Sequence, residues 1–293
     1  MLIVAEDSPI HRALRRLASE RRMVFFVGLP GMGKSLMIHQ LAHLAARTGR
    51  QVHLLQWDVA RPVFEASDAA KRYPMVDGVT HGVIRKAVSL WSRHAVAEWD
   101  RAHAGPEHVL IGEAPLVGHR FIDLVRPAID DAEPLLAAES CSFVIPVPSR
   151  QVRRFLEDER ARRAARPAHE REREDAPPAL LHELWRALVG VARELGVAGA
   201  ASAASDDLPY EPLVYQRVYE LVLKHRRVDV IQVDTVLPAA GLSAYDFAVE
   251  RREITPSPAE AASFIREVDS RYPDTAALKR ETDRWYVNPY SPA

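Results

Sequence analysis

Short runs of apolar residues alternate along the chain with longer stretches in which apolar positions recur at helical spacing. Five of the runs are bounded by polar or turn-forming residues, which is the pattern of strands buried on both faces of a parallel sheet. These predicted strands lie at residues 23–27, 51–55, 108–111, 142–147 and 228–233. Amphipathic periodicity predicts helices at residues 9–22, 33–48, 83–103, 118–126, 180–195, 209–225 and 258–270, and one more that begins after Ser149. Residues 57–62, which follow the second strand, are expected to form a loop.

This alternation predicts an α/β fold with one open, mostly parallel five-stranded sheet and helices on both faces. The predicted sheet and its helices occupy residues 1–237, in which residues 149–178 form a helical lid. Residues 238–293 contain several prolines around one helix and are expected to form a C-terminal extension. Ligands of such sheets bind beyond the carboxyl ends of the strands, so the residues that follow each strand are the candidates for chemistry.

Composition narrows the class of protein. The 39 basic and 40 acidic side chains nearly cancel, so neither a nucleic acid nor a membrane is expected as a partner. No apolar run approaches the roughly 18 residues of a membrane span, and the N-terminus lacks the order of a signal peptide, so we expect a cytoplasmic location. The single cysteine, Cys141, lies in an apolar run and is expected to be buried and unreactive.

The segment between the first predicted strand and the next helix carries the strongest motif. Residues 28–35 read Gly-Leu-Pro-Gly-Met-Gly-Lys-Ser and fit the pattern G-x-x-x-x-G-K-[ST] without a mismatch. Glycines let successive backbone N–H groups turn toward a phosphate chain, and the positive end of the following helix faces the same anion. Lys34 would contact the β and γ phosphates, and Ser35 would ligate Mg²⁺. The predicted nucleotide-binding residues are Gly28, Pro30, Gly31, Met32, Gly33, Lys34, Ser35 and Leu36.

Through this motif and the element order over residues 23–235, the chain resembles the P-loop NTPase superfamily. The resemblance implies ATP and Mg²⁺ as bound groups and Lys34 as a catalytic residue. A guanine-binding Asn-Lys-x-Asp motif is absent from the sequence, whose only asparagine is Asn288, and so is the Ser-Gly-Gly signature of ABC ATPases. The third strand is followed by Gly112-Glu113 instead of the Asp-Glu of AAA-type motors. The most similar branch is that of small-molecule and nucleotide kinases.

Two further places resemble these kinases. Asp58-x-x-Arg61 follows the second strand, where adenylylsulfate kinases and similar enzymes direct the Asp toward the hydroxyl of the acceptor and the Arg toward its anionic group. Arg150, Arg153 and Arg154 begin the helix after the fourth strand, which is similar to the arginine-bearing lid of nucleotide kinases. A solvated helix face is the alternative interpretation of these arginines. Nucleic-acid binding is disfavoured because acidic residues interrupt the segment and aromatic residues are scarce.

Two carboxylates are candidates for the catalytic base. Asp58 could accept the proton of an attacking hydroxyl. Glu113, at the end of the third strand, could hold a Mg²⁺-bound water or orient the hydroxyl, in which case Asp58 would bind substrate. The sequence does not choose between them. Arg120 is a further candidate contact to a substrate phosphate, whereas the neighbouring His119 is expected to be structural.

The sequence therefore favours an ATP-dependent kinase, a transferase that phosphorylates a small anionic acceptor held near Asp58, Arg61 and Arg120. Two alternatives remain open. One is an ATPase that drives a partner protein, with Glu113 orienting water. The other is a nucleotide-dependent interaction module without turnover, which would bind a protein partner through the C-terminal extension.

Overall fold

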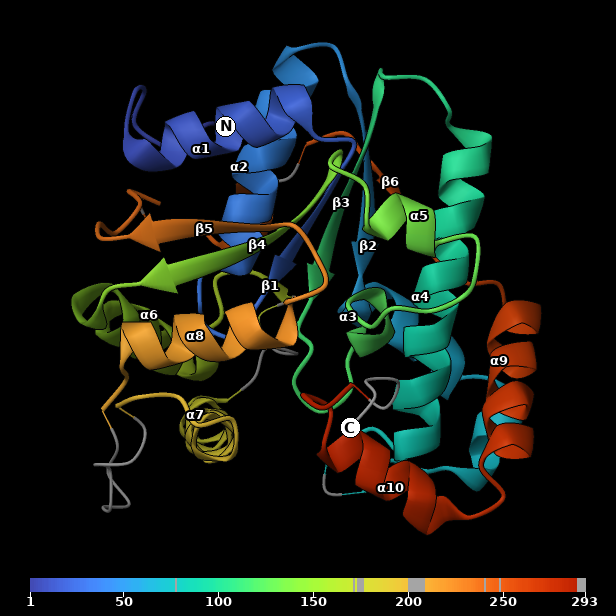
Figure 1. Ribbon diagram of the computed structural model, residues 1–293. Coiled ribbons are helices and arrows are strands. Elements are labelled where there is room, and N and C mark those ends of the chain that lie inside the picture. Colours follow the sequence, from blue (N-terminus) through green and yellow to red (C-terminus); the bar gives the residue numbers. More distant parts are fainter. Residues whose placement is uncertain are drawn as a thin grey trace.

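The computed structural model describes residues 1–76, 78–170, 172, 177–199, 209–239, 241–247 and 249–288. Its centre is an open sheet of six parallel strands in the order β5-β4-β1-β3-β2-β6 (Figure 1). The strands are β1 (Met23–Val27), β2 (Gln51–Gln56), β3 (His108–Ala114), β4 (Cys141–Pro148), β5 (Val228–Val233) and β6 (Arg252–Glu253). The parallel α/β architecture is thus confirmed, but the predicted number of five strands is wrong.

Helices cover both faces of the sheet (Figure 1). They are α1 (Pro9–Glu20), α2 (Lys34–Arg47), α3 (Trp57–Glu65), α4 (Gly82–Ala102), α5 (Glu133–Leu136), α6 (Arg150–Ala165), α7 (Pro178–Glu194), α8 (Pro212–Val222), α9 (Pro258–Arg271) and α10 (Thr275–Asp283). Among the helices in the described ranges, none combines the length and the apolar character that crossing a bilayer requires.

The central strand shows why the strands appear as continuous apolar runs. Met23, Phe25 and Val27 of β1 pack with α4, α7, α8 and α9 on one face, whereas Val24 and Phe26 pack with α1 and α2 on the other. All five side chains are buried, because a central parallel strand is covered on both sides.

The neighbouring strand β4 contains the cysteine. Cys141 is fully buried, as predicted, and burial raises the pKa of its thiol to about 12.

Four local predictions were wrong. The C-terminal extension contains two helices, α9 and α10, instead of one. The sixth strand, β6, pairs with β2 over only two polar residues, which is too short a segment to show a hydrophobic pattern. Residues 57–62 form the first turns of α3 instead of a loop, and the helix includes Pro62. The helix predicted at residues 118–126 is an irregular segment with one 3₁₀ turn at Ile122–Leu124, because positive φ angles at His119 and Phe121 interrupt any regular helix.

The C-terminal extension packs against the sheet domain. Helix α9 lies along α4, and its Ala261, Ile265 and Val268 belong to the same buried core as β1 and β3 (Figure 1). A capping box formed by Ser257 and Glu260 fixes the start of α9.

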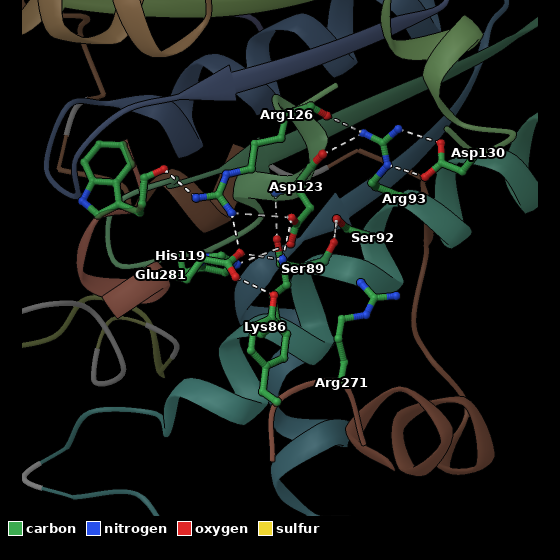
Figure 2. A network of polar contacts seen from close by, with 12 residues as sticks. Lys86, Ser89, Ser92, Arg93, His119, Asp123, Arg126, Asp130, Arg271 and Glu281 are labelled. Atoms are coloured by element: carbon green, nitrogen blue, oxygen red, sulfur yellow. Dashed lines mark hydrogen bonds and ion pairs between the residues drawn. The ribbon is translucent and has the colours of Figure 1, made fainter. Parts of the chain in front are cut away.

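A buried ionic network joins α4, the irregular segment after β3, and α10 (Figure 2). The ammonium of Lys86 lies 2.9 Å from Oδ1 of Asp123 and 2.9 Å from Oε1 of Glu281. Arg126 donates to the same Glu281 oxygen at 2.8 Å. Burial alone would raise the pKa of Asp123, but the charges of Lys86, His119 and Arg126 hold it well below its usual range. These charges are therefore mutually dependent, and the removal of Lys86 would leave two buried carboxylates beside Arg126.

The Lys86→Met substitution tests this dependence. It should lower the free energy of unfolding by about 3–5 kcal/mol, because Asp123 and Glu281 lose the cation that both of them contact at 2.9 Å. Urea denaturation at pH 7 measures the change. Lys279→Met, at an exposed lysine of α10, is the control and should stay within about 0.5 kcal/mol of the parent. Equal stability of the two variants would show that the network contributes little.

Candidate functional site

Parallel strands bring four sequence-predicted segments to one edge of the sheet. These segments leave the carboxyl ends of β1, β2, β3 and β4, where ligands of open α/β sheets bind. They are the glycine-rich loop (residues 28–35), the first turn of α3, the loop at residues 115–121 and the first turn of α6. Interactions among their side chains, given below, show that they form one site.

The glycine-rich loop is compact and closely covered. A Cβ atom added to Gly28 would lie 1.9 Å from the hydroxyl of Tyr215 in α8, so only glycine fits beneath this side chain. Gly33 has a φ of 79° and is the N-cap residue of α2, which has no side-chain cap. The backbone N–H groups of the first turn of α2 therefore remain suited to an external anion.

Lys34 connects the loop to β3. Its ammonium donates to the carbonyl oxygen of Leu29 at 2.9 Å and lies 3.2 Å from Oε1 of Glu113. The side chain is only 4% exposed, so these two acceptors replace the water that would otherwise solvate the ammonium. The register of β1 against β3, with Phe26 opposite Glu113, places the carboxylate beside the start of the loop. The structure thus brings together Lys34 and Glu113, which lie far apart in the sequence.

Asp58 lies in the first turn of α3, next to this ion pair. Surrounding protein and the charge of Glu113 raise the pKa of Asp58 to about 6, although Arg61, Arg120 and Lys34 oppose the shift. The residue still keeps an exposed surface. Asp58 is therefore a carboxylate that is crowded by charges and remains accessible to a second molecule. The guanidinium of Arg61 is positioned by its own helix, because it donates to the carboxylate of Glu65 in α3 at 2.8 Å.

The loop after β3 is strained where it presents Arg120. Leu116, His119 and Phe121 have φ angles of 62°, 68° and 60°, which non-glycine residues rarely adopt. Such conformations cost about 1–3 kcal/mol each and concentrate at functional sites. His119 is fully buried and lies 3.4 Å from Asp123, in agreement with its predicted structural role.

Two arginines near this loop have unused donors. The Nε atoms of Arg120 and Arg85 are buried and have no hydrogen-bond acceptor among the described residues. Burial lowers the pKa of Arg120, and Asp58 partly opposes that effect. Arg85 also donates to the carbonyl oxygen of Gly118 at 2.6 Å. Buried donors of this kind suit an anionic ligand.

Arg85 was missed by the sequence analysis. It is one of many arginines in the chain and lies in α4, with no motif around it. Tyr215 was missed for a related reason, because only the folded chain brings α8 over Gly28.

Only one of the three lid arginines lies on the glycine-rich loop. Nη1 of Arg153 donates to the carbonyl oxygens of Pro30 and Gly31 at 3.2 and 2.9 Å. Its side chain is 2% exposed and is also held by Glu157. Arg150 instead forms an ion pair with Glu211 of the residues before α8, and Arg154 is exposed. The chain from 149 to 178 is described except for residues 171 and 173–176.

Two other residues predicted to bind the nucleotide are Met32, within the glycine-rich loop, and Leu36, just after it. Met32 is buried with its sulfur 3.5 Å from Arg153, and Leu36 is half-buried in the first turn of α2.

Comparison with known proteins adds no relative, since no family model, no curated protein and no solved structure matches this chain.

The Lys34→Ala substitution tests whether the glycine-rich loop binds phosphate. The affinity for Mg-ATP should fall about 10- to 100-fold, the effect of losing one hydrogen bond from a charged group, about 1.5–3 kcal/mol. Titration calorimetry measures the affinity, and circular dichroism checks that the fold is kept. Lys71→Ala, at an exposed lysine paired only with Asp68, is the control and should bind like the parent. Equal affinity in both variants would exclude the loop as the phosphate site.

Proposed function

We propose that this protein is a Mg-ATP-dependent kinase that transfers a phosphoryl group to a small anionic acceptor. The observation that carries the proposal is the grouping of charges beside the glycine-rich loop. Lys34, Glu113 and Asp58 lie within one electrostatic cluster with Arg61 and Arg120. Phosphoryl transfer depends on positioning and on stabilising charge, and these residues supply both.

The architecture supports the same proposal at the level of the fold. The motif at residues 28–35 follows a buried central strand and opens a helix, which is the context that a phosphate-binding loop of this pattern requires. The proposed relationship is to P-loop NTPases, and within them to small-molecule and nucleotide kinases. The adjacent strand, β3, carries the acidic residue Glu113 opposite Phe26 of β1, near the start of the loop.

The residues present fit a Mg²⁺ ion between the loop and β3. Ser35 offers a hydroxyl at the start of α2, and Glu113 offers a carboxylate that could act directly or through water. When bound, Mg²⁺ neutralises charge that develops on the β- and γ-phosphate oxygens. The ammonium of Lys34 adds to this neutralisation, and the uncapped N–H groups of α2 orient the phosphates.

The contacts also distinguish the two carboxylates. Glu113 is already engaged with Lys34 on the side of the glycine-rich loop, whereas Asp58 faces the arginines and keeps an exposed surface. We therefore assign Asp58 as the base that accepts the hydroxyl proton and Glu113 as the metal-side residue. Arg61 and Arg120 orient the anionic group of the acceptor through their guanidinium groups.

An assay of acceptor-dependent ADP release tests the proposal. The full chain is incubated with Mg-ATP and a panel of hydroxyl-bearing carboxylates, sulfates and phosphate monoesters, including nucleoside monophosphates. Stimulated ADP release together with a phosphorylated product supports a kinase. Release that no acceptor changes indicates the ATPase alternative, and Mg-ATP binding without release indicates the interaction module.

The pH dependence of turnover tests the role of Asp58. A base must be deprotonated, and the pKa of Asp58 is about 6, so kcat/KM should fall as the pH drops through about 6. Asp58→Asn should lower kcat/KM by about 10²-fold or more and remove this acidic limb. Glu113→Gln should reduce turnover and keep the limb, but move it to lower pH, because the charge of Glu113 no longer raises the pKa of Asp58.

The exposed Asp68 provides the control for both variants, and Asp68→Asn should match the parent in rate and pH profile. An acidic limb that persisted in Asp58→Asn would assign the base to another group.

The contact of Arg153 with the glycine-rich loop predicts a role in turnover. If its guanidinium moves from the Pro30 and Gly31 carbonyls to the transferring group, Arg153→Ala should lower kcat by about 10³-fold or more, as for an arginine finger. Arg154→Ala, one position along and exposed, is the matched control and should stay within about twofold. Hydrogen exchange of residues 149–165 should slow when Mg-ATP is added. Unchanged exchange together with equal kcat values would reduce α6 to a structural helix.

A further inference from the structure

Three histidines meet at the amino-terminal edge of the sheet, opposite the glycine-rich loop. His53 comes from β2, His103 directly follows α4, and His108 begins β3. One ring nitrogen from each lies within 4.8 Å of the other two. His53 is buried and the other two residues are half-buried, so the group is held by the core and still reaches the surface.

The rings are arranged around a common point instead of being stacked. Their centroids are 4.3, 5.3 and 4.8 Å apart, and their planes cross at 60° to 69°. Nε2 of His53 and Nδ1 of His108 lie 3.2 Å apart and form a hydrogen bond that a bound metal ion would replace. Two imidazole ligands at about 2.0–2.1 Å from a tetrahedral metal ion would have their nitrogens roughly 3.3 Å apart. The spacing therefore matches two ligands of one ion.

Neighbouring acceptors leave metal-binding lone pairs on two of the rings. Nδ1 of His103 lies 3.0 Å from the carbonyl oxygen of Trp99, which accepts its proton and leaves Nε2 free to ligate. Nε2 of His108 lies 3.5 Å from a carboxylate oxygen of Glu107, which favours the tautomer with a lone pair on Nδ1. A carbonyl or carboxylate on the far nitrogen is the usual surrounding of a histidine ligand.

The loop that carries two of the histidines is fixed by arginines. Arg50 donates to the carbonyl oxygens of His108 and Pro106 at 2.8 and 3.1 Å. Arg22 donates to the carbonyl oxygens of His103 and Gly105, and its charge is balanced by Asp100 at 2.8 Å. The backbone that carries these two histidines is thus fixed before any ligand binds, as a selective site requires.

A second group of potential ligands in the described residues serves as a contrast. His119, Asp123 and Glu281 also approach one another, but the ammonium of Lys86 lies 2.9 Å from both carboxylates (Figure 2). That group already contains its cation. The three histidines at the other edge contact one another directly, and the nearest cations, Arg22 and Arg252, act on His53 and His108 from outside the group.

We propose that His53, His103 and His108 bind a divalent transition-metal ion, with Zn²⁺ as the preferred ion and a fourth position open to solvent. Three neutral nitrogen donors suit Zn²⁺, Cu²⁺ or Ni²⁺, whereas Mg²⁺ and Ca²⁺ require oxygen ligands. The bound ion would connect β2, β3 and the end of α4. This site is separate from the proposed kinase site and does not depend on it.

Metal titration of the full chain tests the proposal. The protein is freed of metal with a chelator and titrated with Zn²⁺ against a chromophoric competitor, and with Co²⁺ to record the visible spectrum. We expect one tightly bound ion per chain, a tetrahedral Co²⁺ spectrum and no competition from excess Mg²⁺. Zn²⁺ should also raise the Tm, since a ligand that binds only the folded state stabilises it.

Substitution of the half-buried histidines localises the site. His103→Gln and His108→Gln should each weaken Zn²⁺ binding by about 100-fold or more, since loss of a residue that only supports a ligand already costs about 10- to 100-fold. His94→Gln is the matched control, because this histidine is also half-buried and lies on α4 outside the group. Lys34→Ala should bind Zn²⁺ like the parent, which separates this test from the kinase proposal.

Circular dichroism of the variants without metal shows whether they remain folded. If one of the two variants fails to fold, the Zn²⁺ affinity of the other variant tests the site. Zn²⁺ affinity equal to that of His94→Gln in the folded variants, or a parent that binds no Zn²⁺, overturns the proposal.

Discussion

Parallel pairing of β1 with β3 is the constraint on which the site depends. The register that sets Phe26 opposite Glu113 brings the carboxylate to within 3.2 Å of Lys34, although nearly eighty residues separate them in the chain. Because β2 and β4 run in the same direction, α3 and α6 begin at the same edge and contribute Asp58 and Arg153. A slip of one residue between β1 and β3 would turn Glu113 to the opposite face of the sheet.

The strained loop after β3 depends on contacts far from the site. Three non-glycine residues with positive φ angles hold Arg120 close to Asp58, and that conformation must be stabilised from outside. The ionic network around Asp123 lies directly behind this loop and joins it to α4 and α10. The geometry at the surface is therefore supported by buried charges, and the C-terminal extension is part of that support.

Much of the fold was predictable because its strands are buried on both faces. Five apolar runs located five strands, and the motif at residues 28–35 located the loop. The failures have local causes. Strand β6 consists of only two polar residues at the edge of the sheet. Helix α3 begins directly after β2, with no turn residue between them to mark its start. Positive φ at His119 and Phe121 replaced the predicted helix, because tertiary contacts outweighed its periodic pattern.

The site was predictable where residues directly follow a strand. Asp58 and Glu113 were identified from their places at strand ends and Lys34 from the motif, and Arg153 was one of three candidates in the helix after β4. Arg85 and Tyr215 come from helices whose approach is set only by packing, so local patterns do not reveal them. The three histidines are likewise spread over two strands and a helix end, with no motif spacing.

The contact between Lys86 and Glu281 affects how the chain can fold while the ribosome is still synthesising it. Synthesis proceeds from the N-terminus, so α4 and the β3 loop emerge long before α10. Until α10 has been made, Lys86 can pair with Asp123 but not with Glu281, and Arg126 also lacks that carboxylate. The glycine-rich loop can form early, whereas the loop that carries Arg120 gains its full support only afterwards. A nascent chain should thus form the glycine-rich loop, the proposed phosphate site, before the loop that is proposed to contact the acceptor.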